Sequence, residues 1–448
     1  MDTAPASPHR RLWALALPIL LTNLTTPIVG LTDTAVMGHL DGPVHLGAVS
    51  VGAMIFTFVA WSFGFLRMGT TALTAQALGS NDAAEERAVL ARGLAVAGAI
   101  GAVLLVLSLP ITGAALAIVD PSPAVAGEAE TYLLIRSWAF PVTLANYALL
   151  GWLFGEMRPR AALAQQVSIY TTNVVLDLLF VLQFDMTADG VALASALAEV
   201  VGLVVGAVLA ARHLRQRGGA WERARLLDLV AARRLLGLNR DLFARTIVLQ
   251  LAFAWFTAVG ARFGDTVLAA NAVLLQFLVF SAHALDAFAF AVEALVGTSV
   301  GARNPAGVAA AGRVAALWSG IAAAGFAVVY FIAGGPVIAG LTDLPEVREA
   351  AGTYLAWAAP LPIVAVWSYL LDGMFIGATW TGALLKAMVL SFAAFAVAVL
   401  TLTPSLENHG LWLALHVFFV ARAVTLAAAL PGRLVALGAS GGETVAAR

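Results

Sequence analysis

The chain has 448 residues but no cysteine, and charged residues make up only 11% of it. Without cysteine there can be no disulfide, no thiolate nucleophile and no cysteine-ligated metal site. An average soluble domain carries roughly 25% charged residues, so this chain lacks the polar surface that faces water. Its net charge of -1 argues against nucleic acid as a partner.

Motifs of intramembrane enzymes are also missing. The sequence contains no His-Glu-x-x-His pair of zinc ligands, no glycine-rich phosphate loop and no cluster of histidines and cysteines. We therefore expect a protein that is not an enzyme, with no catalytic residues, no metal and no cofactor.

Apolar residues, by contrast, make up 61% of the chain and gather in long runs. A helix that spans a bilayer needs about 20 mostly apolar residues. The first run is longer than the core of about 7–15 residues in a signal peptide, so we expect it to stay as a membrane helix. Twelve runs qualify as spans: 12–38, 46–78, 88–110, 129–153, 161–183, 190–212, 241–261, 267–298, 308–333, 351–376, 383–403 and 410–432.

Basic residues orient these spans. Arginines gather at the N-terminus, in the loops after the even-numbered spans and above all between Arg212 and Arg240, whereas the opposite loops are acidic. The positive-inside rule then places both termini in the cytoplasm of a multi-pass protein of the bacterial inner membrane. Leu226, Leu227, Val230 and Leu235 have helical spacing, so the segment 212–240 is predicted to form an amphipathic helix on the membrane surface.

The second half of the chain repeats the first at one fixed offset of 222, the step from Gly38 to Gly260. The shift superposes glycine, proline and tyrosine positions that would rarely match by chance. Because the unit holds an even number of spans, the copies must be parallel repeats. We expect an all-α membrane protein of twelve helices in two six-helix bundles, related by a pseudo-twofold along the membrane normal. The predicted domains are residues 1–216, a cytoplasmic linker over 217–240, and residues 241–448.

Several motifs resemble the multidrug and toxic compound extrusion (MATE) family over essentially the whole chain. They are Leu17-Pro18-Ile19 with Asp33-Thr34-Ala35, Gln76-Ala77-Leu78-Gly79, Glu293-Ala294-Leu295-Val296-Gly297 and Asp372-Gly373-Met374-Phe375-Ile376-Gly377. The last two look like the DNA-damage-inducible (DinF) branch. The resemblance implies export of amphiphilic organic compounds, cationic ones among them, by alternating access against a proton or sodium gradient.

Four polar residues inside the spans are predicted to share one depth. Asp33 lies near the outer end of the first span, Asn173 and Asp177 lie one turn apart in the fifth, and Ser195 lies in the sixth. A charged residue within a span costs about 2.5–3.5 kcal/mol even on the lenient insertion scale, so it suggests a function. The family resemblance assigns the same four positions to a proton or cation site, with Ser195 where threonine is usual.

Structural carboxylates are the alternative interpretation of Asp33 and Asp177. The repeat maps them to Trp255 and near Val399, so the second bundle folds without the cluster, which favours a functional role. Two carboxylates close together in a low dielectric should share a proton. Pro18 and Pro27 lie in the helix of Asp33, where each either permits a functional kink or shapes a static helix.

The second half carries its own acids, Asp286, Glu293 and Asp372, in the inner half of the membrane. Arg67 maps by the repeat to position 289, which lies between Asp286 and Glu293, so Arg67 should lie at the depth of these acids. An ion pair between Arg67 and one of them across the inner cleft would form a gate. The alternative is that these acids are neutralised within their own bundle, with Arg422 as another partner. Both interpretations stay open at this point.

The pattern as a whole predicts a secondary active multidrug exporter that exchanges protons for small amphiphilic substrates and works as a monomer in the lipid bilayer. Sodium coupling is the nearest alternative, but sodium-driven relatives carry a glutamate in the seventh span, which has no acid here after Asp241. A flippase of lipid-linked precursors would need a more basic cavity than Arg67, Lys386 and Arg422 supply. A channel fits one-sided carboxylates less well than coupled transport does.

Overall fold

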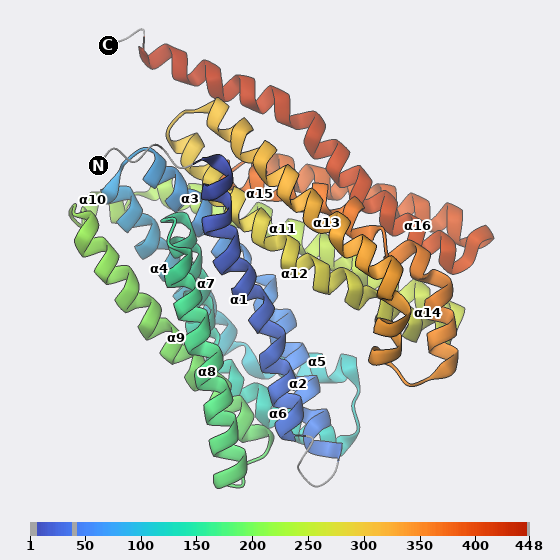
Figure 1. Cartoon of the computed structure of the whole chain (residues 1–448). Helices are drawn as coiled ribbons and strands as arrows, with labels where there is room; N and C mark the ends of the chain where they lie inside the picture. Colours follow the sequence, from blue (N-terminus) through green and yellow to red (C-terminus); the bar gives the residue numbers. More distant parts are fainter. Residues whose placement is uncertain (1–6, 38–42, 446–448) are drawn as a thin grey trace. The chain divides into compact units, whose positions relative to one another are not determined.

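The computed structural model describes the backbone of residues 7–37 and 43–445 and the side chains of residues 7–23 and 44–439. In these ranges every regular element is a helix (Figure 1). The chain divides into two compact units. We call Leu21–Leu235 the N-terminal unit, and Met1–Leu20 with Leu236–Arg448 the C-terminal unit.

The helix α1 (Pro8–Met37) begins in the C-terminal unit and continues into the N-terminal unit. The domain boundaries predicted at 216 and 240 therefore differ from the observed division, which assigns the first turns of α1 to the second half of the chain. The reason is local packing, because Trp13 lies edge-on against Phe288 and Trp318, with ring centroids 5.4 and 5.2 Å apart.

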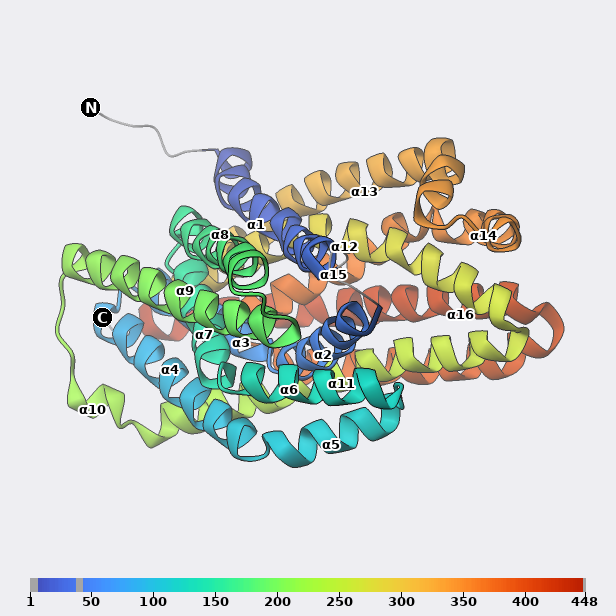
Figure 2. The same cartoon turned by 90° about the horizontal axis from the view of Figure 1, so that it is seen from below.

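The N-terminal unit is a bundle in which α8 packs along α9, and α7 lies against α3 and α4. Figure 2 shows the short α5 beside α6. Its further helices are α2 (Pro43–Ser62), α3 (Phe65–Gly79), α4 (Ala83–Val106), α5 (Ser108–Val119), α6 (Pro123–Ser137), α7 (Phe140–Gly155), α8 (Pro159–Gln183), α9 (Ala188–Arg217) and α10 (Arg223–Leu226).

The C-terminal unit is built around α12, which packs against α13, α14 and α15. Its helices are α11 (Leu229–Gly260), the 3-10 turn η1 (Ala261–Phe263), α12 (Asp265–Gly301), α13 (Pro305–Leu341), α14 (Pro345–Ala358), α15 (Leu361–Gly377) and α16 (Thr381–Val445). The last of these is two helices joined at Glu407, whose φ of 48° is non-helical.

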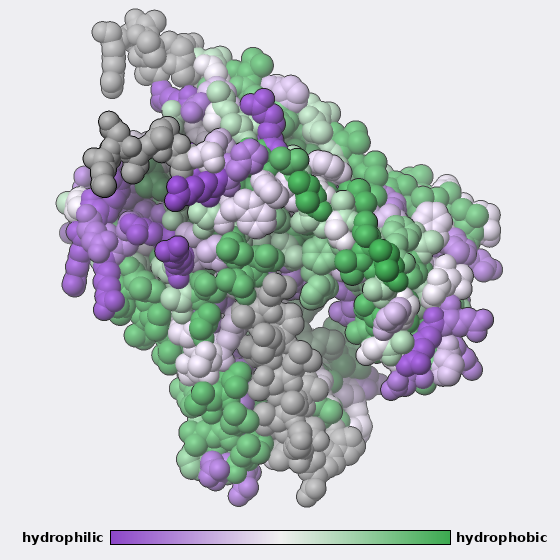
Figure 3. Space-filling model, viewed as in Figure 1, coloured by the Kyte–Doolittle hydropathy of each residue, from purple (hydrophilic) through white to green (hydrophobic). Residues whose placement is uncertain are grey.

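Eight helices of the described chain are long and apolar enough to cross a membrane, or ten when each of two bent pairs counts as one span. Dividing α16 at Glu407 and adding α1 accounts for the twelve spans predicted. Many apolar side chains are exposed, such as Ile332 on α13 and Val106 on α4. Figure 3 shows the apolar surface on the helix sides and the hydrophilic surface at helix ends. Such a surface suits a lipid environment.

Backbone details repeat at the predicted offset of 222. Asp82 caps α4 by accepting a hydrogen bond from the Glu85 amide (3.0 Å), and Asn304 caps α13 through the Gly307 amide (2.9 Å). Six of the seven non-glycine residues with positive φ in the described chain also pair at this offset: Asn81 with Arg303, Met157 with Thr379, and Asp185 with Glu407. Both units bend a span at equivalent places, by 53° between α6 and α7 and by 50° between α14 and α15.

Glycines make the same close helix contact in both units. A Cβ added at Gly151 of α7 would lie less than 3.0 Å from the backbone carbonyl of Arg67 in α3, and one at Gly373 of α15 would meet the carbonyl of Ala289 in α12 in the same way. Positions 67 and 289 are also related by the offset of 222. The internal repeat thus holds down to single backbone contacts, which only glycine permits.

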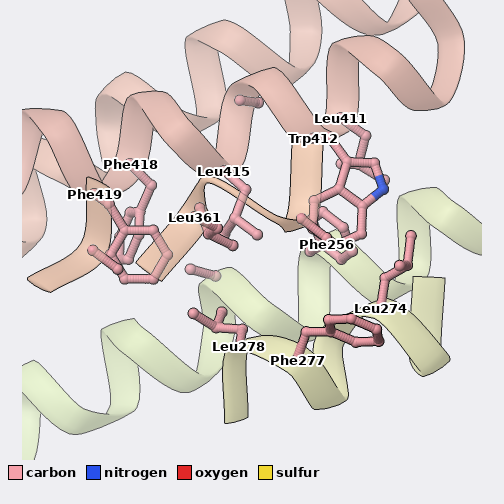
Figure 4. Close-up of a cluster of buried hydrophobic side chains, with 14 of the residues drawn as sticks. Phe256, Leu274, Phe277, Leu278, Leu361, Leu411, Trp412, Leu415, Phe418 and Phe419 are labelled. Atoms are coloured by element: carbon pink, nitrogen blue, oxygen red, sulfur yellow. The ribbon is translucent and has the colours of Figure 1, made fainter. Parts of the chain in front are cut away.

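The core of the C-terminal unit is aromatic. Figure 4 shows Phe256 of α11 with Trp412 of α16, and Phe277 of α12 beside them. The Phe256 and Trp412 rings meet edge-on with centroids 5.2 Å apart. The indole nitrogen of Trp412 donates to Asn271 Oδ1 (2.9 Å), and Asn271 and Asn408 exchange amide hydrogen bonds. Buried polar groups in this core are therefore satisfied by one another.

The predicted amphipathic helix over 212–240 is wrong as a single element. The helix α9 ends at Arg217, before Gly218, and Asp228 starts α11 by accepting hydrogen bonds from the Val230 and Ala231 amides (2.8 and 3.1 Å). Between them only the short α10 is helical, and Arg225 ties α10 to α4 through Asp82 (3.2 Å). Capping and ion pairing with α4 thus decided the local structure against the apolar spacing.

A largely buried polar cluster lies where α4 begins and where α7 and α9 end. Arg217 of α9 bonds to Glu86 of α4 (3.0 Å), and His213 of α9 bonds to Glu156 (2.8 Å), which directly follows α7. Burial raises the pKa of the Glu156 carboxyl above its ordinary value of 4.5, the hydrogen bond with His213 opposes the shift, and the charge of Glu86 adds to it.

We predict that Gly151→Ala forces α7 away from α3 and lowers stability by about 1–3 kcal/mol, the usual cost of overpacking. Gly373→Ala should do the same in the C-terminal unit. Gly98→Ala is the matched control, because nothing lies within 4 Å of its added Cβ. Thermal unfolding of purified protein, followed by size-exclusion chromatography, measures all three. Equal melting temperatures for Gly151→Ala and Gly98→Ala would contradict the close contact.

We also predict a pH-dependent stability contribution from Glu156. Because its pKa is higher in the folded state, folded protein binds more protons, and stability falls as the pH rises above 4.5 toward the folded-state pKa. Glu156→Gln should remove this fall, so the melting temperature of the variant relative to the parent should increase with pH. Glu130→Gln, an exposed position on α6, is the control. Parallel melting curves at all pH values would disprove the contribution.

Candidate functional site

Three of the four predicted coupling residues lie together in the N-terminal unit. Asn173 of α8 donates a hydrogen bond from Nδ2 to Ser195 Oγ of α9 (3.1 Å). Asp177 lies one turn beyond Asn173 on α8 and is 0% exposed, and Asn173 is 2% exposed. The contact between α8 and α9 thus brings a buried amide and a buried carboxyl close to a half-buried hydroxyl.

These residues also share a depth. Asp177 lies between one and two turns before the end of α8 at Gln183, and Ser195 lies just under two turns after the start of α9 at Ala188. At about 1.5 Å per residue, both lie roughly 10 Å from the loop that joins the two helices. Their role in coupling stays a prediction.

Asp33 and Pro27 lie in the part of α1 whose side chains are outside the described residues. The backbone of α1 is helical from Pro8 to Met37 and passes through both Pro18 and Pro27 without an interruption. Each proline lacks an amide hydrogen and so leaves one carbonyl in the preceding turn without its helical partner. The suggested kink function stays a prediction.

A second polar set in the same unit was missed by the sequence analysis. Asn146 of α7 donates from Nδ2 to Oε2 of Glu199 on α9 (2.6 Å) and to the Glu199 backbone carbonyl (2.9 Å). Gln165 of α8 donates from Nε2 to Asn146 Oδ1 (3.0 Å). The signal was available, because Glu199 is an ionisable residue within a span, one turn from Ser195 and on the same face.

Arg67 and the two acids proposed as its gate partners lie in different units. Arg67 is buried on α3, where Gly151 packs on its backbone carbonyl. Asp286 and Glu293 lie on one face of α12, two turns apart, and Glu293 is buried. The gate hypothesis stays a prediction.

Asp372 has partners within its own unit. Its carboxylate on α15 forms ion pairs with Arg245 of α11 and Arg422 of α16, including a bond from Arg422 Nε to Oδ1 (3.2 Å). All three side chains are buried. Asp286 and Glu293 supply the further negative charges that act on Arg245. For Asp372 the structure therefore supports neutralisation within the bundle, with Arg422 as anticipated and Arg245 in addition.

The comparison with protein families matches the MatE family model to residues 18–179 and 242–402. Among curated proteins, the chain is 45% identical over 422 residues to DNA damage-inducible protein F of Escherichia coli, a match that covers 94% of this chain and 92% of the relative. It is 28% identical to the probable multidrug resistance protein NorM of Caulobacter vibrioides over 365 residues, 78% of this chain and 72% of the relative.

Solved structures share the fold. The Vibrio cholerae MATE transporter VcmN in the bent form superposes with a TM-score of 0.85 at 20% identity, covering 96% of this chain and 98% of that one. An outward-facing multidrug resistance MATE transporter superposes with a TM-score of 0.83 at 18% identity, covering 96% and 97%. Two separate matched segments, one in each repeat, and a close relative across nearly the whole length agree: this chain is a multi-pass integral membrane protein of the MatE family of transporters.

Proposed function

We propose that the protein is a secondary active exporter that couples efflux of amphiphilic organic compounds, cationic ones among them, to proton entry by alternating access. The observation that carries this proposal is the set formed by the buried Asn173 and Asp177 with Ser195 in the N-terminal unit. The family and the names of the relatives, a multidrug resistance protein among them, support efflux.

The asymmetry between the units supports a functional role for this set. At the offset of 222, Asn173 and Asp177 correspond to Phe395 and Val399, which lie in the hydrophobic core of the C-terminal unit. The shared scaffold therefore folds with apolar residues at these positions. A buried carboxylate that the scaffold does not require is costly, and protonation is the simplest way to relieve that cost.

Protons fit the site better than sodium does. The helix α11 contains the seventh predicted span, 241–261, and carries Arg245 within it. The one acid of α11, Asp241, lies at the start of that span and bonds to Arg240 and Thr381. Arg245 and Arg422 are occupied by Asp372, which leaves little basic surface for the pyrophosphate of a lipid-linked precursor.

Proton entry supplies enough free energy. A charge that crosses 100 mV yields about 2.3 kcal/mol, and each pH unit adds about 1.36 kcal/mol. Since about 1.4 kcal/mol corresponds to a tenfold gradient, one proton sustains a substrate gradient of roughly a hundredfold. In the proposed cycle, protonation of Asp33 and Asp177 from outside favours substrate release and return to the inward-facing state.

We predict that Asp33→Asn and Asp177→Asn abolish efflux driven by a pH gradient, because asparagine mimics the protonated state permanently. Ser195→Ala should weaken coupling without removing it, since it deletes only the acceptor of the Asn173 hydrogen bond. The measurement is dye export from proteoliposomes under an imposed pH gradient without sodium. Asp120→Asn, at an exposed left-handed position that asparagine tolerates, is the matched control. Full activity of Asp33→Asn would refute proton coupling at this site, and strict dependence on sodium would reassign it.

We predict the opposite phenotype for Asp372→Asn, which leaves Arg245 and Arg422 buried together without their carboxylate. Removing one partner of a buried ion pair costs about 3–5 kcal/mol, so this variant should unfold at a much lower temperature, whereas Asp177→Asn should stay folded. Melting temperatures of the two purified variants test this difference. A stable Asp372→Asn protein that fails only in transport would place Asp372 in the transport machinery instead.

A further inference from the structure

A second intramembrane carboxylate, the half-buried Glu199, lies deeper in the N-terminal unit than the Asp177 set. It follows the start of α9 at Ala188 by about three turns, one turn more than Ser195. At about 1.5 Å per residue it lies roughly 16 Å along the helix, near the middle of a hydrocarbon core of about 30 Å. Since residues four apart share a helix face, Glu199 continues the polar face that Ser195 begins.

The surroundings of Glu199 form a built site rather than an isolated polar residue. Asn146 donates to its Oε2 (2.6 Å) and is in turn held by Gln165 (3.0 Å), and both amides are buried. Gly206 of α9 makes the room, because an added Cβ there would lie 2.8 Å from Gln165 Cδ. A glycine, two amides and a carboxyl from three helices are thus fitted to one another.

Polar and charged groups from two neighbouring helices surround Glu199. Arg136 of α6 brings a cation near it, and Asn146 of α7 donates its amide hydrogen bond. Tyr147 on α7 also faces Glu199. On α8, the titratable groups on this side are Tyr170 and Asp177. The described part of α2 contributes only His45, which is paired with Glu128. A carboxyl group among an amide, a cation and a phenol is a candidate for proton exchange.

The repeat shows that the scaffold does not require this site. At the offset of 222, Glu199 corresponds to Ala421, Gln165 to Ala387 and Asn146 to Ser368. Ser368 bonds only to its own helix, at the Ala365 carbonyl (2.7 Å). The C-terminal unit keeps the same helix packing without a carboxyl or amide at these places, as it does at the positions of Asn173 and Asp177.

We propose that Glu199, held by Asn146 and Gln165, is a second proton-binding site of the N-terminal unit, which takes a proton from the Asp177 set. In this step the O–H bond of protonated Asp177 breaks, one proton passes along the hydroxyl of Ser195, and an O–H bond forms on Glu199, with no change in oxidation state. The inference rests on the proposed proton-coupled function but concerns a different residue. Each transport cycle would then load two carboxyl positions in series.

Infrared difference spectroscopy of the whole reconstituted protein, titrated with acid in deuterated buffer, tests proton binding without transport. Glu199→Gln keeps an acceptor for Asn146, so it should fold and should lose one carboxyl band that titrates in the parent. Glu199→Asp should retain a titrating band, and Asn146→Leu should move its pH midpoint. Glu130→Gln, exposed on α6, should leave the buried band unchanged.

Proton uptake per exported dye, measured with a pH indicator inside proteoliposomes, adds the link to transport. Glu199→Gln should lower this ratio, and Glu199→Asp should restore it in part. The proposal is overturned if Glu199→Gln shows the same titrating carboxyl bands as the parent. It is also overturned if an active Glu199→Gln protein keeps the parent's proton uptake per exported dye and its pH profile. Either outcome leaves the proposed function intact. A titrating Glu199 band in a parent protein that exports dye without protons would instead refute the proposed function and retain the proton site.

Discussion

The constraint on which this structure depends is that a charge inside a lipid bilayer must be neutralised by the protein itself. Each unit meets it differently. The C-terminal unit gives Asp372 two arginines from neighbouring helices. In the N-terminal unit, Glu199 accepts a hydrogen bond from the Asn146 amide and lies near the cation of Arg136, and Asp177 lies one turn from the Asn173 amide. Two arginines bonded directly to a carboxylate hold it charged more strongly than one amide and one neighbouring cation do. The choice of partner therefore distinguishes Asp372 from the two acids that we propose to bind protons.

The two halves keep one scaffold and differ in what they place on it. Caps, left-handed turn residues, bent spans and the glycines at helix contacts recur at the offset of 222. These features depend on the backbone, which has few alternatives where two helices touch at glycine. Side chains at other positions are free to change chemistry, so Asn173 and Phe395 occupy corresponding places with opposite polarity. Candidate functional residues in this chain can thus be found as polar residues of one half whose counterparts in the other half are apolar.

Charged groups are also paired at the helix ends near the linker, outside the apolar spans. Arg217 forms an ion pair with Glu86, and Arg225 forms one with Asp82. Arg87 donates a hydrogen bond to the Leu214 carbonyl. The arginines between 212 and 240 therefore do more than report the side of the membrane. They also tie the short α10 and the end of α9 to α4, which holds the connection between the two units against the N-terminal unit at one end.

Much of this protein follows from sequence alone. Span number, the repeat, the family and the positions of Asn173, Asp177 and Ser195 could be predicted, because lipid imposes long apolar helices and makes each intramembrane polar residue conspicuous. The tertiary structure alone decided which groups meet. It paired Asp372 of α15 with Arg245 of α11, joined Glu199 to Asn146 and Gln165, and replaced the expected surface helix by the capped start of α11. The depth of a residue along a helix can be counted from the helix ends. The face that meets a neighbouring helix depends on how the helix is rotated and packed, and the sequence of so uniformly apolar a chain has no periodicity that predicts this rotation.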